Sequence, residues 1–260
     1  MNNGPLISII MNCLNGAKYL KQSIKSVIDQ KYKNWELIFW DNNSSDNSAE
    51  ILFSFKDKRI KYFRSNNFSK LYRGRNLAIK KAKGDYITFL DTDDWWIKNK
   101  LIKQVSLLEK NKNIKIIYSN LYFFDQKKRK KRLFMKTKLD SGKIAKKLLK
   151  KYVVGILTVL IDRKIFKNYK FNEHYTIIGD FDLFIRLSLK YHFYAIQKPL
   201  AYYRVHDSNY LENNTQEYIS ELKYWIKNNY YQFKKKKIDL IYPRLTLKKC
   251  QVKNFVQNFF

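Results

Sequence analysis

Three carboxylates stand together after a short apolar segment of the chain. Asp91, Asp93 and Asp94 directly follow residues 86–90, whose sequence Tyr-Ile-Thr-Phe-Leu is typical of a buried strand. Carboxylates this close repel one another unless a cation or hydrogen-bond donors neutralise them. Hard divalent ions take oxygen ligands, and Mg²⁺ commonly uses one or two carboxylates together with substrate phosphates. The cluster therefore predicts a metal site for a phosphorylated ligand; the alternative is an acidic turn that caps the next helix.

A second acidic pair lies far downstream, at the start of a predicted helix over residues 180–189. Asp180 and Asp182 are two residues apart, so on a helix they point in different directions and only one of them can face a given cleft. A carboxylate that faces the metal site would suit a general base acting on a hydroxyl group. The alternative is that both acids simply stabilise the amino end of the helix.

Three further residues are candidates for ligand binding, although the evidence for each of them alone is weaker. Asp41 ends a predicted strand, where a carboxylate binds a base or a ribose, or else serves as a turn residue. Arg75 stands near the start of a predicted helix, where it could contact a nucleotide or phosphate. His206 has Arg204 as a close neighbour, which makes a phosphate contact conceivable.

The apolar patterns that must position these residues alternate between strands and helices. They predict strands at 6–11, 35–40, 59–63, 86–90 and 114–118, and helices at 20–28, 49–55, 74–83, 97–110, 144–149, 180–189 and 218–233. Gly84 is expected to stop the helix over 74–83, and the basic run 127–132 to form a solvated loop. Such alternation is typical of an α/β fold with a mostly parallel central sheet flanked by helices. Ligands bind such sheets beyond the carboxyl ends of the strands, where the polar clusters 12–15, 41–46 and 91–94 would meet.

Composition limits the class of protein. The chain has 260 residues, of which 45% are hydrophobic, so global disorder is excluded. The length fits one domain over 1–210 followed by a basic, aromatic, helical extension over 211–260. The two cysteines, Cys13 and Cys250, exclude a disulfide framework and favour a reducing compartment. No apolar run reaches the ~20 residues of a membrane span, and the first residues lack a signal-peptide pattern, so a cytoplasmic protein is expected.

The charge is strongly positive and uneven. The formal net charge is +31, with 31 basic and 10 acidic residues in positions 126–260 against 22 and 12 in positions 1–125. Such a surplus attracts nucleic acid, anionic lipid or phosphorylated substrates, although codon bias of an AT-rich genome would also raise the lysine count. We expect the extension to rest on an anionic membrane surface on the inner side of the cell membrane. A tail packed on the domain and a contact between subunits of an oligomer are the alternatives.

Six segments, in order, match a known family. They are Leu6 to Asn15, Trp40 to Ser48, Arg75 to Ala78, Lys83 to Asp94, Gly179 to Leu183 with Arg186-Leu187, and Tyr203 to Ser208. On these segments the chain resembles family 2 glycosyltransferases with the GT-A fold, a Rossmann-like architecture, over about residues 5–210. It departs from the family pattern at Asn12-Cys13, where Pro-Thr is usual, at Asn42-Asn43, where Asp-Gly is usual, and at Gly179, where Glu is frequent.

The resemblance implies inverting transfer of a sugar from a nucleotide-diphosphate sugar, with Mn²⁺ or Mg²⁺ as cofactor. Asp180 would be the catalytic base, and Asp93 and His206 would hold the metal. The nucleotide-binding residues would be Asn12, Leu14, Asn15, Asp41, Arg75 and Asp91. Further candidates for contacts with donor or acceptor are Asp94, Trp95, Thr158, Gly179 and Arg204.

The expected function is therefore transfer from a nucleotide sugar, with UDP as the preferred nucleotide, to a hydroxyl of a glycan or lipid-linked acceptor in cell-surface polysaccharide synthesis. One alternative is a metal-dependent nucleotidyltransferase, which also uses paired carboxylates on a parallel sheet but would not need Asp180. The other is a basic nucleic-acid-binding protein, which accounts for the charge but not for acids gathered at strand ends. Nucleic acid is therefore not an expected partner.

Overall fold

The computed structural model describes residues 4–207, 209–210 and 214–259. The strands are β1 (Ile7–Cys13), β2 (Trp35–Asp41), β3 (Ile60–Arg64), β4 (Tyr86–Phe89), β5 (Trp95–Trp96), β6 (Ile116–Asp125), β7 (Lys130–Leu133), β8 (Leu160–Asp162) and β9 (Phe193–Val205). The helices are α1 (Ala17–Ile28), α2 (Ser48–Phe53), α3 (Leu71–Lys81), α4 (Lys100–Lys110), α5 (Ala145–Lys150), α6 (Gly179–Ser188), α8 (Thr215–Lys235) and α9 (Ile241–Phe259). Two 3₁₀ turns, η1 (Ile156–Thr158) and η2 (Arg163–Lys167), flank β8.

Within the described residues the strands form one nine-stranded mixed sheet in the order β3-β2-β1-β4-β8-β6-β9-β5, with β7 paired to β6. The first four of these strands are mutually parallel, as predicted. Strand β8 is antiparallel to both β4 and β6, and β6 is parallel to β9. It follows that β9 runs in the same direction as β1, β2 and β4. All four of these strands therefore end at one edge of the sheet.

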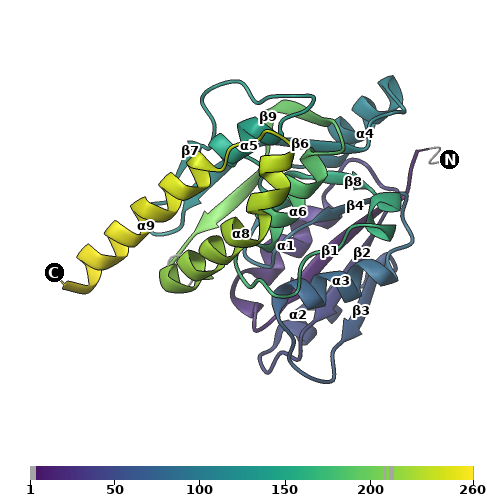
Figure 1. Cartoon of the computed structure of the whole chain (residues 1–260). Coiled ribbons are helices and arrows are strands. Elements are labelled where there is room, and N and C mark those ends of the chain that lie inside the picture. The colour runs from purple at the N-terminus through teal and green to yellow at the C-terminus, as the bar shows by residue number, and fades with distance from the viewer. Residues whose placement is uncertain (1–3, 208, 211–213, 260) are drawn as a thin grey trace.

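Side chains alternate along the parallel strands and build two cores, one on each face of the sheet. On one face, Ile38 and Phe89 pack with residues of α3, α6 and α8. On the other face, Ile9 and Phe39 pack with residues of α1, α2 and α4. Figure 1 shows helices on both sides of the sheet. This layered arrangement explains why the first strands are apolar on both faces.

The predicted role of Gly84 is wrong. Helix α3 ends at Lys81, two residues before the expected boundary, and Gly84 lies in the connection to β4. A Cβ atom on Gly84 would lie 2.6 Å from the backbone nitrogen of Ser8 and 2.7 Å from the carbonyl oxygen of Leu6. The glycine therefore permits the close approach of β1, rather than a left-handed turn at a helix end.

Two elements in the second half differ from the sequence-based expectation. The last three residues of the basic run 127–132, together with Leu133, form the edge strand β7 (Lys130–Leu133), which pairs with β6 and leaves its lysines exposed; the turn before it covers 126–129. Charged side chains on an edge strand discourage pairing with other chains, which explains this composition. Strand β9 was not predicted, because Gln197, Lys198 and Pro199 interrupt its apolar pattern where its pairing with β6 shifts register.

The C-terminal helices pack on the body of the protein. Leu222, Trp225 and Phe233 of α8 belong to the same core as α3 and α6. Helix α9 packs on α8 and α5, and its C-terminal end projects away from the sheet (Figure 1). The division between 1–210 and 211–260 stays a prediction. Within the described part of the chain, no helix is both long enough and apolar enough to cross a lipid bilayer.

Candidate functional site

The polar clusters predicted at strand ends do meet at one edge of the sheet. Asn12 is the last residue but one of β1, Asp41 is the last residue of β2, Asp91 follows β4, and His206 follows β9. In the register of the parallel pair, Asn12 lies beside Trp40 and Cys13 beside Asp41. Because these strands run in one direction, the chain delivers a carboxylate, an amide and an imidazole to the same region.

Arg75 joins the aspartate cluster to the second acidic segment. Its guanidinium donates a hydrogen bond of 2.6 Å to Asp91, and the Arg75 side chain is almost fully buried. Beside the larger effect of burial, the positive charge of Arg75 lowers the pKa of Asp180 and the negative charge of Asp91 raises it. The structure therefore brings Asp91 and Asp180 into one electrostatic environment, although 88 positions separate them in the chain.

Two tyrosines that the sequence analysis missed surround Asp180. The hydroxyl of Tyr152 lies 3.4 Å from Asp180 Oδ2, and the hydroxyl of Tyr72, which donates to the Ile177 carbonyl at 2.7 Å, lies 3.5 Å from Oδ1. The backbone N–H of Phe181 donates to Oδ1 at 2.8 Å. Burial raises the pKa of Asp180 above its ordinary value, and the charge of Arg75 opposes the rise. A carboxylate with a raised pKa is a stronger base than an ordinary aspartate.

Gly179 is the position where a side chain cannot be accommodated. A Cβ atom there would lie 2.4 Å from the ring of Tyr72, which is buried and stacks on Phe171 with 5.3 Å between ring centroids. The space beside this glycine is thus filled by Tyr72 of α3. The ring of Tyr72 therefore occupies the space beside residue 179, where a Glu side chain is frequent in the family.

We expect Gly179→Ala to destabilise the fold, because the added methyl group forces Tyr72 to move within a packed core. Overpacking of this kind typically costs about 1–3 kcal/mol, which corresponds to a fall of several degrees in melting temperature. Thermal denaturation followed by circular dichroism measures this. When Tyr72 is first replaced by Leu, the obstructing ring is gone. Adding Gly179→Ala to Tyr72→Leu should then lower the melting temperature less than Gly179→Ala lowers that of the native protein. An unchanged melting temperature for Gly179→Ala would contradict the packing argument.

Asp93 and His206 lie side by side. The distance from Asp93 Oδ2 to His206 Nε2 is 3.1 Å, and the His206 side chain is only 10% exposed. Among the described residues no three His, Cys, Asp or Glu side chains are grouped as a complete metal site. The carboxylate oxygen suits Mn²⁺ or Mg²⁺, which fill their other positions with water and phosphate oxygens, whereas the imidazole nitrogen is a softer donor that suits Mn²⁺ better than Mg²⁺. The donor set therefore fits an ion that binds together with a diphosphate.

Arg204 fixes the loop that carries these ligands. Its backbone N–H donates to Asp94 Oδ1 at 2.8 Å, and its Nε donates to the carbonyl oxygen of Asp93 at 2.7 Å. The guanidinium lies 4.3 Å from the Tyr19 ring centroid and 4.5 Å from that of Trp95. Burial, with the charges of Asp93 and Asp91, raises the pKa of Asp94 well above its ordinary value. Arg204 and Asp94 are thus buried parts of the framework.

Two buried polar atoms without protein partners lie at the ends of β1 and β2. They are Oδ1 of Asn12, an acceptor, and Nε1 of Trp40, a donor. A Cβ atom on Gly74 of α3 would lie 2.8 Å from Asn12 Nδ2 and 3.5 Å from Trp40 Nε1, so a glycine backbone borders both side chains. Buried polar groups are normally satisfied, and a bound ligand is one way to satisfy these two. The sequence analysis selected Asn12 but missed Trp40, although Trp40 directly precedes Asp41.

The remaining predicted nucleotide-binding residues shape the same edge. Asp41 is buried and accepts hydrogen bonds of 2.7 Å from the N–H of Ser44 and from the hydroxyl of Tyr62. Burial and this contact raise the pKa of Tyr62 to about 12. Asn15 accepts a 2.8 Å hydrogen bond from the N–H of Ser45 and so ties the two loops together. Leu14 is 48% exposed and open to a ligand.

Thr158 does not line the edge. Its side chain is fully buried, and its hydroxyl donates to the carbonyl oxygen of Gly155 at 2.7 Å. The expectation of a substrate contact there is wrong, because the apolar stretch around it folds into the core as η1 and β8. Trp95, in contrast, is partly exposed and stacks on Tyr202 with 4.7 Å between centroids.

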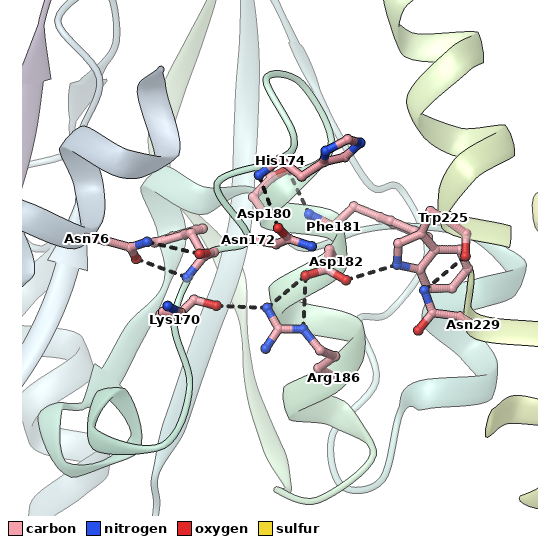
Figure 2. A network of polar contacts seen from close by, with 11 residues as sticks. Asn76, Lys170, Asn172, His174, Asp180, Phe181, Asp182, Arg186, Trp225 and Asn229 are labelled. Carbon is pink, nitrogen blue, oxygen red and sulfur yellow. Dashed lines mark hydrogen bonds and ion pairs between the residues drawn. The ribbon is translucent and has the colours of Figure 1, made fainter. Parts of the chain in front are cut away.

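Asp182 anchors α6 from the side opposite to Asp180. Figure 2 shows its carboxylate between Arg186 and Trp225. Arg186 donates to Oδ2 at 2.7 and 2.9 Å, and Trp225 Nε1 donates to Oδ1 at 3.1 Å. A surface hollow of about 500 Å³ adjoins this network, lined among others by Asp182 and Arg186. Asp182 therefore holds the helix in place, while the carboxylate of Asp180 contacts Tyr72 and Tyr152.

Comparisons with known proteins agree with this geometry. The model of the family described as glycosyl transferase family 2 matches residues 8–189. The chain belongs to this family. It is 40% identical over 167 residues to the Escherichia coli UDP-Glc:alpha-D-GlcNAc-diphosphoundecaprenol beta-1,3-glucosyltransferase WfgD, covering 64% of each chain. It is 32% identical over 221 residues to the Escherichia coli enzyme of the same description named WfaP, covering 83% of this chain and 84% of that one.

Solved structures share the fold. The family 2 chain superposes with a TM-score of 0.64 on S. aureus TarS 1-349 in complex with UDP, at 17% identity, over 83% of this chain and 65% of that one. The TM-score is 0.63, at 12% identity, for the mannosyltransferase PcManGT from Pyrobaculum calidifontis in complex with GDP-Man and Mn²⁺, over 86% of this chain and 65% of that one. The α/β, GT-A prediction is confirmed. The chain thus spans about two thirds of WfgD and of these structures.

Proposed function

We propose that this family 2 glycosyltransferase moves a sugar, with inversion, from a UDP-sugar to a hydroxyl of a lipid-linked or glycan acceptor in cell-surface polysaccharide synthesis. The observation that carries the proposal is the convergence of Asp91, Arg75 and Asp180 beside the Asp93–His206 pair. The names of WfgD and WfaP describe transfer from UDP-Glc to a diphosphoundecaprenol-linked acceptor, which supports this donor and acceptor class. The complex of TarS with UDP supports the nucleotide.

The reaction we propose is a direct displacement at the anomeric carbon of the donor. The carboxylate of Asp180 accepts the proton of the acceptor hydroxyl while its oxygen bonds to the anomeric carbon. The bond from that carbon to the diphosphate oxygen breaks, and the diphosphate keeps the electron pair. Tyr72 and Tyr152 border the base and exclude water from it, and Arg75 holds Asp91 toward the donor.

Asp93 and His206 are the residues that would hold Mn²⁺ or Mg²⁺. When bound, the ion would neutralise charge on the departing diphosphate. The complex of PcManGT contains Mn²⁺, which supports this cofactor class. Asn12, Asp41 and Trp40 would surround the base of the nucleotide, where Asn12 Oδ1 and Trp40 Nε1 have unused hydrogen-bonding capacity. We place the protein on the cytoplasmic side of the membrane, peripheral to it.

A donor screen tests the proposal. The protein is incubated with UDP-, GDP- and dTDP-sugars and Mn²⁺, and the products are identified by mass spectrometry. We expect slow hydrolysis that releases a nucleoside diphosphate, fastest with a UDP-sugar. Release of pyrophosphate from a nucleoside triphosphate and a sugar phosphate would instead support a nucleotidyltransferase and contradict the proposal. Salt-sensitive DNA binding that survives Asp93→Ala would support the nucleic-acid interpretation.

A further inference from the structure

Helix α9 has a protein-facing side and a solvent-facing side. The protein-facing positions are buried or half-buried: Pro243, Leu247, Cys250 and Asn254. Three apolar side chains lie on the opposite side, where Ile241 is 49% exposed, Leu245 45% and Val252 64%. They are spaced by four and seven residues, so they form one stripe along the helix. This stripe is the outward face of α9.

Positive charge borders the outward face. Arg244, Lys248 and Lys249 are exposed and lie within one turn of the apolar stripe, and Ile241–Phe259 contains no acidic residue. The exposed lysines of 234–237 precede α9 by the short connection 238–240, in which the exposed Asp239 accepts a hydrogen bond from the N–H of Ile241. An apolar stripe flanked by lysine and arginine is the pattern of a helix that lies in the interfacial plane of an anionic bilayer.

The outward face belongs to a helix that lies close to Asp180. Tyr242, in the first turn of α9, has its ring centroid 5.6 Å from the ammonium of Lys150 at the end of α5. Two residues later in the chain, Tyr152 reaches the Asp180 carboxylate at 3.4 Å. Tyr218 of α8 packs against the same core as Leu247 of α9 and Phe181, the residue that follows Asp180 in α6. Helix α9 is therefore one layer away from the proposed base.

We propose that the outward face of α9 binds the surface of an anionic bilayer and so presents the Asp180 region to acceptors anchored there. The role in acceptor delivery rests on the proposed function, but the surface assignment does not. A second copy of the chain is a poorer partner, because a two-fold contact would place the same cations against each other. Nucleic acid is also a poorer partner than a bilayer, since the centre of the outward face is apolar. The membrane alone matches both the charge and the stripe.

Co-sedimentation of the full chain with vesicles tests the assignment. Vesicles of phosphatidylcholine alone are compared with vesicles of equal parts phosphatidylcholine and phosphatidylglycerol. We expect the native chain to bind the anionic vesicles much more tightly. Each basic residue at such a surface contributes ~1 kcal/mol, so Lys248→Glu with Lys249→Glu should weaken binding by at least about tenfold. Leu245→Glu with Val252→Glu should weaken it comparably, because charged groups do not enter the acyl boundary.

Matched controls come from α4, on the other face of the sheet. Ile102 of α4 is 40% exposed, and Lys110 at its end and Lys112 just after it are exposed. Lys110→Glu with Lys112→Glu therefore makes the same double charge reversal away from α9, and Ile102→Glu makes the same type of apolar-to-glutamate change at one position. These variants should bind vesicles as the native chain does. Equal losses in control and α9 variants, or no preference of the native chain for anionic vesicles, would overturn the assignment. A dimer that the α9 substitutions abolish, without vesicle binding, would also overturn it.

Transfer assays separate this inference from the proposed function. With a short, water-soluble acceptor, the α9 variants should keep the native rate, whereas with an acceptor embedded in anionic vesicles their rate should fall with their binding. Native protein that binds vesicles but transfers no sugar would contradict the proposed function and support the surface assignment. A native rate on the embedded acceptor despite lost vesicle binding would contradict the delivery role.

Discussion

Asp180→Asn should abolish sugar transfer while UDP binding is retained. Asparagine has the same shape as aspartate but cannot accept the proton of the acceptor hydroxyl, and a general base typically contributes about 10²–10⁴-fold to the rate. The residue touches Tyr72 and Tyr152 rather than the strand ends assigned to the nucleotide, so donor affinity should not change. Steady-state transfer rates and isothermal titration with UDP and Mn²⁺ measure the two quantities. Near-native transfer by Asp180→Asn would show that another group is the base.

The pH dependence gives a second readout for the same residue. Burial raises the pKa of Asp180, so the native rate should fall as the pH drops through this raised value, because the protonated carboxyl cannot act as a base. The residual activity of Asp180→Asn should lack this decrease. Stability depends on pH in the opposite direction to the rate. The folded state holds the proton of Asp180 more tightly than the unfolded state, so ionisation of this carboxyl destabilises the fold. Asp180→Asn should therefore melt higher at pH 7, and the gain should vanish below about pH 4.

Asp93→Ala should remove the metal-dependent part of donor binding. The substitution deletes the carboxylate that lies 3.1 Å from His206 and leaves the imidazole as the only protein ligand we assign there. Even the loss of an outer-shell partner costs 10–100-fold in metal affinity, so we expect UDP affinity in Mn²⁺ to fall by about a hundredfold or more. Titrations of UDP with Mn²⁺ and with a chelator measure the difference.

A matched control for Asp93→Ala is Asp29→Ala. Asp29 follows the last residue of α1, at the edge of the sheet away from the site, and pairs with an exposed Lys25 at 3.0 Å. This variant should bind UDP as the native protein does, in both conditions. If Asp93→Ala kept the native response of UDP binding to Mn²⁺, the assignment of Asp93 and His206 to the metal would fail.

The sequence alone indicated the parallel half of the sheet and the gathering of polar residues at one of its edges. Short, mainly apolar segments such as 35–40 favour strands buried on both faces, and polar residues that follow parallel strands share an edge. The order of β8, β6 and β9 could not be predicted from the sequence, because their pairing depends on contacts between residues far apart in the chain. The placement of Asp180 beside Asp91 followed from the resemblance, not from periodicity.

The partners of the predicted residues were the least predictable part. Tyr152 lies in a loop without any repeating pattern, and only the packing of α5 against α6 brings it to Asp180. Arg204 was expected to contact the substrate, yet its guanidinium lies between two aromatic rings beneath Asp93. A basic side chain near a metal site cannot be assigned to ligand or framework without knowing what surrounds it.

The indole of Trp225 makes the stability of α6 depend on the presence of the C-terminal helices. This ring stands on α8 yet supplies one of the hydrogen bonds to Asp182, which stabilises α6, the helix whose second residue is Asp180. A chain shortened after β9 would lose that donor and leave a buried carboxylate short of a partner, at a cost of about 1–3 kcal/mol. Shortened variants would thus lose activity through a loosened α6, even where no membrane is present.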